Sequence, residues 1–393
     1  MRFLKKILVS SLAAFMLLAQ PCHAATWPQP PKIAATSWIL IDATTGQTLA
    51  ADNADAAIEP ASLTKLMTAY LTFTALRERR LRLEQSVPSP AENEIPPGSR
   101  MFLTSTSEAT VAELLKGLII VGANDAAIAL AKAIADSEQS FVELMNKTAE
   151  KLGLQKTRYA NASGQQQAGH KTSVRDMAKL SEALINEFPE QLREFGRREF
   201  TYNSIRQLNR NRLLWLDNSV DGLITSRTDA EGYAIAISAR RPQPIGARER
   251  LQRRLVAVIA GASSEETRSQ EGLKLLNFGF QQFDVMRLFR ANEISVEVPV
   301  FKGAVANTRI HFPKDVLVAV PRGQADKIRT ELKRPTALLA PLTVGQPVGE
   351  LEIWLNDQAI HRVPMTIADP VKPAGLFGRA IDTMRLWLKS ISK

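Results

Sequence analysis

The sequence predicts a mixed α/β domain, followed by a small all-β domain and a C-terminal amphipathic helix. Between residues 37 and 283, stretches with apolar residues at helical spacing alternate with short runs rich in Val and Ile. From about 290 to 368, short alternating segments are separated by Pro and Gly, which indicates strands. We therefore expect a first domain over 33–285, a β domain over 290–368 and a helix over 374–393.

Residues 1–24 have the features of a secretion signal. Three cations precede an apolar run over 7–18, and Cys22-His23-Ala24 offers a small-x-small cleavage site. Cys22 is the single cysteine, so the mature chain is expected to have no disulfide, thiol nucleophile or thiolate metal site. We therefore expect an exported, periplasmic protein.

Turns and apolar spacing predict the elements in order. A strand at 37–42, a turn at 43–46 and a return strand at 47–50 read as a hairpin, and Pro60 then precedes a helical pattern. The expected helices are 62–77, 111–134, 139–152, 173–187 and 264–280, and the later strands of the first domain are 233–238 and 255–259. Strands of the β domain are expected at 295–300, 308–312, 315–320, 350–355 and 359–367.

Ser62 and Lys65 are candidate catalytic residues. Residues three apart on a helix share one face, so the Lys65 amine can serve as the base that activates the Ser62 hydroxyl. The pattern alone is not specific, because it occurs again at Ser390 and Lys393. A helix-capping Ser62 beside a solvated Lys65 is the alternative, whereas the hairpin that leads into this helix favours a catalytic site.

Other kinds of catalytic centre receive little support. His170, His311 and His361 are far apart, so a Ser-His-Asp triad is conceivable only through His170, which is more simply a loop residue. A histidine-based zinc site is not expected, and the sequence indicates no metal or organic cofactor.

The C-terminus predicts a helix that lies on a membrane surface. Along 375–393 one helical face is apolar, and four cations lie off that face beside the single Asp382. The segment carries too many charges to span a bilayer. A helix docked on the protein's own core is the alternative, but the proline-containing linker 370–373 favours an independent tail.

The charge of the chain points to an anionic partner. The formal net charge of +10 falls to +7 without the cations of residues 1–24. No nucleic-acid module is recognised, so an anionic membrane surface or wall polymer is expected and nucleic acid is not. The sequence does not define an oligomeric state.

Further motifs resemble those of a known enzyme family. Penicillin-recognising serine enzymes combine S-x-x-K with S-x-N and K-T-G. Here Ser62-Leu63-Thr64-Lys65 is followed, in that order, by Gly122-Ala123-Asn124 and Ile224-Thr225-Ser226, and the segments 152–154, 161–164, 175–178 and 275–280 agree as well. Over essentially the whole mature chain, the sequence resembles the low-molecular-mass penicillin-binding proteins, which are D-alanyl-D-alanine carboxypeptidases.

This resemblance implies a fold, a reaction and a location. The fold is a penicillin-binding, β-lactamase-like serine transpeptidase domain with a β sandwich and an amphipathic anchor. The reaction removes the terminal D-alanine from peptidoglycan stem peptides through an acyl-serine intermediate, on the outer face of the inner membrane. Stem peptides or β-lactams are then the ligands, in cell-wall biogenesis and the control of cell shape.

The resemblance also implies roles for single residues. Ser62 is the nucleophile, Lys65 the base and Asn124 a third catalytic residue. Thr225, Ser226 and Arg268 are implied to bind substrate. Arg268 aligns with an arginine that family members use near the substrate carboxylate. An ordinary surface arginine is the alternative for Arg268. Arg227 lies three positions from 224, so a regular strand directs it to the opposite face.

Three of the family positions are altered, which predicts impaired catalysis. Gly122 lacks the hydroxyl of the family serine, so a proton route to the leaving amine loses a member. Ile224 replaces the family lysine, so we expect Lys65 to keep a higher pKa and remain protonated. Ser226 replaces a glycine and adds bulk where substrate approaches.

Three interpretations therefore remain open. The chain is a slow D,D-carboxypeptidase, a membrane-tethered pseudoenzyme that binds peptidoglycan or acts as a scaffold, or a protein that acylates and slowly hydrolyses β-lactams. No deacylating glutamate motif is identifiable, so a standard β-lactamase is not supported.

Overall fold

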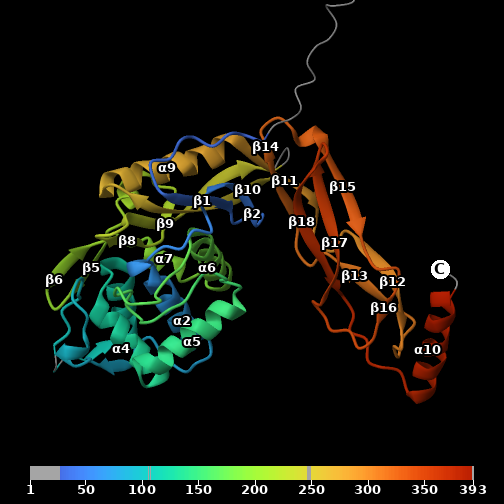
Figure 1. Ribbon diagram of the computed structural model, residues 1–393, viewed down its shortest axis with the longest axis horizontal. Helices are drawn as coiled ribbons and strands as arrows, with labels where there is room; N and C mark the ends of the chain where they lie inside the picture. The colour runs from blue at the N-terminus through green and yellow to red at the C-terminus, as the bar shows by residue number, and fades with distance from the viewer. Residues whose placement is uncertain (1–26, 105, 107, 246–248, 392–393) are drawn as a thin grey trace, which may run out of the picture. The chain divides into compact units, whose positions relative to one another are not determined.

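The computed structural model describes residues 27–391 apart from 105, 107 and 246–248, so the expected signal over 1–24 lies outside the described residues (Figure 1). The chain forms two compact units. The large unit comprises Pro30–Glu293 with Lys314–Arg322, and the β unit comprises Ile294–Pro313 with Gly323–Lys393. No helix in the described part of the chain is long and apolar enough to cross a membrane.

A central antiparallel sheet organises the large unit. Its strand order is β2-β1-β10-β9-β7, and β8 also pairs with β9. All six residues of β1 are buried, as expected for an apolar strand inside a sheet. The strands are β1 Ser37–Asp42, β2 Gln47–Asp52, β7 Val220–Gly222, β8 Thr225–Thr228, β9 Gly232–Pro244 and β10 Arg250–Ala262.

Helices cover both faces of this sheet. Figure 1 shows α9 on one face and the cluster that contains α2, α4, α5 and α6 on the other. Ser173 and Ser264 cap α6 and α9, because each side chain accepts a hydrogen bond from a backbone N–H three residues later. The helices are α2 Lys65–Arg77, α3 Val111–Lys116, α4 Asn124–Ala135, α5 Glu138–Lys151, α6 Val174–Glu187, α7 Leu192–Phe195, α8 Leu213–Leu216 and α9 Glu265–Gln282, and a 3-10 turn, η1 Ala61–Thr64, precedes α2.

Smaller two-stranded sheets complete the large unit. β3 Ser86–Pro88 pairs with β4 Glu108–Thr110, β5 Glu199–Tyr202 pairs with β6 Ile205–Leu208, and β11 Phe283–Phe289 pairs with β14 Val316–Pro321. The strand expected at 315–320 therefore forms, but it pairs with β11 in the large unit instead of joining the β unit.

The single helix expected over 111–134 is wrong, because the chain breaks at Gly122. A π-helical turn, η3 Gly117–Val121, follows α3, and Gly122 then adopts φ 73° before α4 begins at Asn124. Left-handed backbone favours glycine, and apolar spacing alone cannot reveal it. The break places the start of α4, and with it Asn124, at the site described below.

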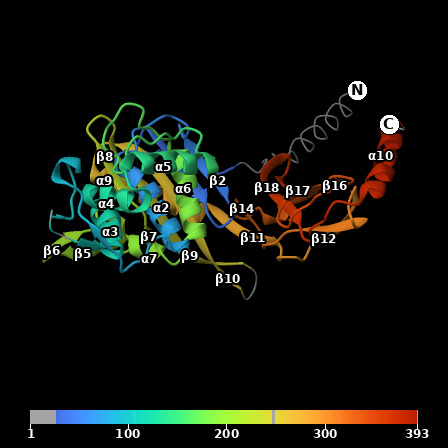
Figure 2. The ribbon, with the colours of Figure 1, turned by 90° about the horizontal axis from the view of Figure 1, so that it is seen from below.

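The β unit is a six-stranded sheet with a terminal helix. Its order is β15-β17-β18-β13-β12-β16, and α10 Leu376–Ile391 follows the last strand. Both views place α10 beside the end of the sheet at β16 (Figures 1 and 2). The strands are β12 Ser295–Phe301, β13 Asn307–His311, β15 Ile328–Lys333, β16 Leu338–Leu339, β17 Pro347–Leu355 and β18 Gln358–Ile367.

Candidate active site

Ser62 and Lys65 lie together at the start of α2. Ser62 is in η1, and Lys65 is the first residue of α2. The Lys65 Nζ lies 3.4 Å from the Ser62 Oγ, within reach of a proton transfer. Lys65 is buried, whereas Ser62 lines an open cleft, so the amine approaches the hydroxyl from the protein side.

Asn124 and Ser163 hold the Lys65 amine. Its Nζ donates to the Asn124 Oδ1 at 2.8 Å and to the Ser163 carbonyl oxygen at 2.6 Å. Asn124 is fixed in turn, because its Nδ2 donates to the Pro97 carbonyl oxygen at 2.9 Å. The break at Gly122 thus brings Asn124 next to Lys65.

The pKa of Lys65 is lowered to about 7. Burial is the main cause, and the positive charge of Arg210 lowers the pKa further, while Asp125 raises it. The expectation that Lys65 keeps a high pKa without a cation at position 224 is therefore wrong. Sequence reasoning assigned no role to Arg210.

Two of the three altered family positions, Gly122 and Ile224, both line the cleft but have different surroundings. Ile224 is buried and belongs to the hydrophobic core of the large unit. Gly122 lines the cleft, and a Cβ built on it meets no atom within 4 Å. Position 224 is thus adapted to an apolar side chain, whereas position 122 has space for a side chain but requires left-handed backbone.

Ser226 contacts the nucleophile turn. Its Oγ donates to the Pro60 carbonyl oxygen at 3.0 Å, and Pro60 is the residue before η1. Both Thr225 and Ser226 are buried residues of β8 that line the cleft. The hydroxyl that replaces a family glycine thus ties β8 to the turn that carries Ser62.

Arg268 is a buried cation at the same cleft. It lies in α9, and its Nη atoms donate to the Ser226 and Arg210 carbonyl oxygens, each at 3.4 Å. Its Nε has no hydrogen-bond partner among the described residues. Burial lowers the pKa of Arg268 to about 10, so the group stays charged at neutral pH. Its Nη2 also pairs with the Glu265 carboxylate at 3.4 Å, and the unpaired Nε is suited to an anionic ligand.

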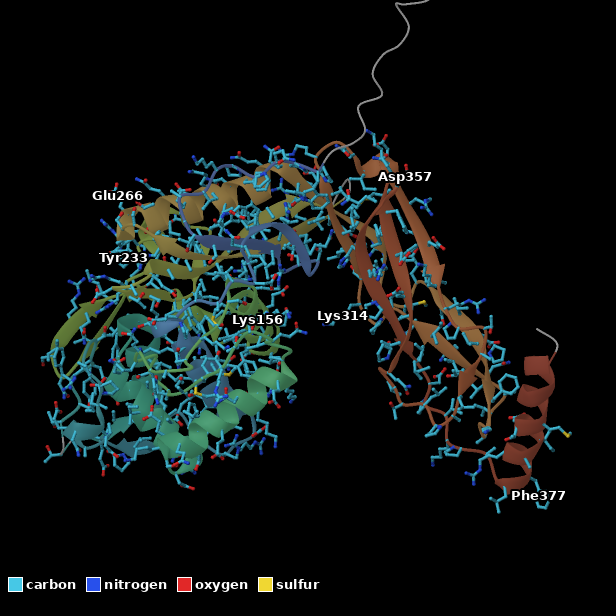
Figure 3. The ribbon with its side chains drawn as sticks, in the orientation of Figure 1. Lys156, Tyr233, Glu266, Lys314, Asp357 and Phe377 are labelled. Carbon is cyan, nitrogen blue, oxygen red and sulfur yellow. The ribbon has the colours of Figure 1, made fainter. Side chains whose placement is uncertain are left out.

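One cleft of about 490 Å³ collects these groups. Tyr233, labelled in Figure 3, lines it near the start of β9. Arg227 reaches its rim, but the guanidinium is mostly exposed and pairs with Asp229 at 2.9 Å. The site residues that line the cleft are Ser62, Gly122, Asn124, Arg210, Ile224, Thr225, Ser226 and Arg268.

His170 does not form a triad with Ser62. Its ring is buried, the Nδ1 accepts from the Ala160 N–H at 2.9 Å, and the Nε2 lies 2.7 Å from the Thr64 Oγ1. The Nε2 therefore carries the proton and donates it to Thr64. Burial lowers the pKa of His170 to about 4, so the ring is neutral where it contacts Thr64 of η1.

Within the described residues, no group of three or more His, Cys, Asp or Glu could hold a metal.

Comparisons with known proteins cover both units. A family model described as D-alanyl-D-alanine carboxypeptidase matches residues 24–263, and one described as the C-terminal domain of penicillin-binding protein 5 matches 283–373. The Escherichia coli D-alanyl-D-alanine carboxypeptidase DacC is 36% identical over 381 residues, which cover 94% of this chain and 93% of the relative.

Solved structures agree with the family models. Penicillin-binding protein 5 from Haemophilus influenzae matches with a TM-score of 0.76 and 31% identity, over 88% of this chain and 99% of its own. Penicillin-binding protein D2 from Listeria monocytogenes, solved in a cefotaxime-bound form, matches with a TM-score of 0.57 and 27% identity, over 65% of this chain and 100% of its own.

Proposed function

The chain belongs to the D-alanyl-D-alanine carboxypeptidase family, and on that premise we propose that it releases the terminal D-alanine of peptidoglycan stem peptides through an acyl-Ser62 intermediate. One observation carries this proposal. The buried Lys65 amine, with its pKa lowered to about 7, lies 3.4 Å from the Ser62 Oγ. A substantial fraction of Lys65 is then neutral at physiological pH and available as a base.

Lys65 activates Ser62 without any histidine. In the neutral amine, two N–H bonds remain on the Asn124 Oδ1 and the Ser163 carbonyl oxygen, and the lone pair is left for the Ser62 hydroxyl proton. The Ser62 Oγ then bonds to the carbonyl carbon of the scissile peptide, and the C–N bond to D-alanine breaks. The proton taken by Lys65 leaves with the amine, and water later hydrolyses the ester.

Cations beside the nucleophile select a substrate with a free carboxylate. Arg268 is buried with a free Nε, and the exposed Arg210 lines the same cleft. The Thr225 hydroxyl adds a donor in the same cleft. Together they replace the ammonium group that Ile224 lacks, because a guanidinium keeps its charge and offers several donors to a carboxylate.

Gly122 makes the enzyme slow. Position 122 has no hydroxyl to pass the proton from Lys65 to the leaving amine. By analogy with other acid–base groups, this lowers the catalytic rate by about 10²–10⁴-fold. The same observation favours a second candidate, a pseudoenzyme that retains Ser62 and Lys65 but binds peptidoglycan without turnover. The two candidates differ in whether Ser62 forms a covalent bond and releases D-alanine.

Intact-mass spectrometry tests the proposal. We expect the protein to gain the mass of a β-lactam on incubation, and we expect Ser62→Ala to remain unmodified. Ser390→Ala is the matched control, because it removes the serine of the second Ser-x-x-Lys pattern and leaves Ser62 in place. Release of D-alanine from a pentapeptide is then measured. Absence of any adduct would refute the acyl-Ser62 enzyme and leave the pseudoenzyme.

We also propose that α10 attaches the protein to the periplasmic face of the inner membrane. Leu376, Phe377, Ile381 and Met384 are exposed on this helix, and Phe377 is labelled at its start in Figure 3. Its Asp382, in contrast, accepts the Lys302 backbone N–H at 2.7 Å. The polar side thus holds the helix to the β unit while apolar groups face outward, the arrangement that an interfacial helix requires. Deletion of residues 375–393 is expected to release the protein from membranes.

A further inference from the structure

The β unit exposes apolar side chains next to α10. Leu339 of β16 is 54% exposed and Val305 is 51% exposed, although both are aliphatic. On α10, Leu376 and Phe377 are 78% and 89% exposed. Scattered exposed apolar residues are ordinary, but a cluster at one end of a domain marks an interaction surface.

Backbone hydrogen bonds bring these residues to the same end of the β unit. Leu339 pairs with Phe301 between β16 and β12, and the next residue, Lys302, donates its N–H to Asp382 of α10. Ala374, just before α10, donates to the Lys302 carbonyl oxygen at 2.8 Å.

The loop that holds Val305 is tied to the same segment. Ala304 donates to the Lys372 carbonyl oxygen at 2.8 Å, and Gly303 forms a bridge with Pro373. Leu339, Val305 and the start of α10 are therefore connected through one short stretch of backbone.

The charge at this end is positive. Lys302, Lys372 and Arg379 lie on the connected segments, and Lys372 and Arg379 are exposed. The nearby carboxylate, Asp382, already accepts the backbone N–H of Lys302. A surface with exposed aliphatic groups and surrounding cations matches the interface of an anionic bilayer, where acyl chains lie below phosphate groups.

We propose that the tip of the β unit, formed by Val305 and Leu339 with Lys302 and Lys372, inserts into the membrane interface together with α10. This inference rests on the proposed attachment through α10 and extends it. Interfacial binding strengthens with the buried apolar area and with attraction to anionic lipid, so a second apolar and cationic contact strengthens the binding. Two contacts on one folded unit also fix its orientation on the bilayer, which a helix on a free linker does not.

Vesicle co-sedimentation tests the inference with the chain over residues 25–393. With vesicles of phosphatidylglycerol and phosphatidylethanolamine, we expect Val305→Asp/Leu339→Asp to lower the partition coefficient about tenfold. Leu339→Trp is expected to raise it. The matched control is Leu208→Asp, because Leu208 is also a strand leucine, 57% exposed, but lies in the large unit. Thermal unfolding checks that each variant is folded, and vesicles of phosphatidylcholine alone test the need for anionic lipid.

The outcomes separate this inference from the anchor proposal. If deletion of 375–393 releases the protein but the double variant binds like wild type, the tip inference is overturned and the anchor stands. If the deletion changes nothing, the anchor proposal fails. Light scattering without lipid tests whether the tip binds a second copy of the chain instead. If the wild type forms a dimer and the double variant is a monomer, the inference is overturned and the tip is assigned to that second copy.

Discussion

The Asn124 Oδ1 lies 2.8 Å from the Lys65 Nζ, although the two residues are 59 positions apart in the sequence. Asn124 can hold the amine because its own Nδ2 is bound to the Pro97 carbonyl oxygen, which sets the orientation of the amide. The oxygen must therefore face Lys65, where it accepts one N–H bond from either the neutral or the charged amine. Lys65 is thus held in place without being forced to stay protonated.

The rate of β-lactam acylation should rise with pH around a midpoint of about 7. Neutral Lys65 is the base, and its pKa is lowered to about 7, so the protonated form dominates below this value and the neutral form above it. Arg210→Gln removes a like charge and is expected to move the midpoint to higher pH. Acylation kinetics across this range measure both midpoints. Arg206→Gln is the control, and an unchanged midpoint in Arg210→Gln would contradict the role of Arg210.

Two substitutions at Asn124 should act differently. Asn124→Ala removes an acceptor from the Lys65 amine and is expected to slow acylation about 10²-fold. Asn124→Asp keeps an acceptor but places a negative charge beside Lys65, which raises the pKa of the amine. The pH–rate midpoint should then move upward, with activity recovered in alkaline buffer. A profile of Asn124→Asp with the wild-type midpoint would refute this account.

Arg268→Met should weaken substrate binding more than it slows catalysis. Loss of a charge-assisted contact to the carboxylate is expected to raise KM about 10–10²-fold for a pentapeptide that ends in free D-alanine. An amide-capped pentapeptide should be affected little, since it has no carboxylate to bind. Steady-state kinetics on both peptides test the prediction, with the exposed Arg212→Met as the control. Equal losses on the two peptides would exclude a carboxylate-binding role.

Gly122→Ser should raise turnover at a cost in stability. The new Cβ meets no atom within 4 Å, but φ 73° is unfavourable for any side chain, at about 1–2 kcal/mol. Gly122→Ala has the same strain without a hydroxyl and is the matched control. We expect both variants to unfold at a lower temperature, and only the serine to accelerate D-alanine release, by up to about 10²-fold. Equal activities of the two variants would show that the hydroxyl is not what the site lacks.

Ile224→Lys should destabilise the fold, in spite of restoring the family residue. Ile224 is 4% exposed in the core of the large unit, so a lysine there places a charge at a buried position. We expect a loss of about 2–4 kcal/mol in the free energy of unfolding, against less than about 1.5 kcal/mol for Ile224→Met. Denaturant unfolding measures both, and a Lys variant as stable as the Met variant would contradict the assigned burial.

Local patterns predicted much of the fold and of the site, and contacts through space account for the rest. The hairpin before η1 and the helices α5, α6 and α9 form where turn residues and apolar spacing indicated them. The helix over 111–134 breaks because Gly122 adopts left-handed backbone, which residue spacing does not encode.

Within the site, the sequence motifs named Ser62, Lys65 and Asn124, and the structure brings these three together. The effect of the Arg210 charge on the pKa of Lys65 could not be read from the sequence. The two residues are 145 positions apart, and only the folded chain brings the charge close enough to act. The burial of Lys65 and His170 could not be read from the sequence for the same reason, because it also depends on packing. Burial lowers the pKa of Lys65 more than any neighbouring charge does, and it keeps the loop residue His170 neutral beside Thr64 of η1.

The free Nε of Arg268 has a consequence for the empty protein. A buried guanidinium with long hydrogen bonds is poorly solvated, so the ligand-free cleft lowers the stability of the fold. Any small carboxylate that completes this hydrogen bonding binds the folded chain alone and raises its melting temperature by mass action. Thermal-shift titration with carboxylates too small to acylate Ser62 therefore offers a ligand screen that does not depend on turnover.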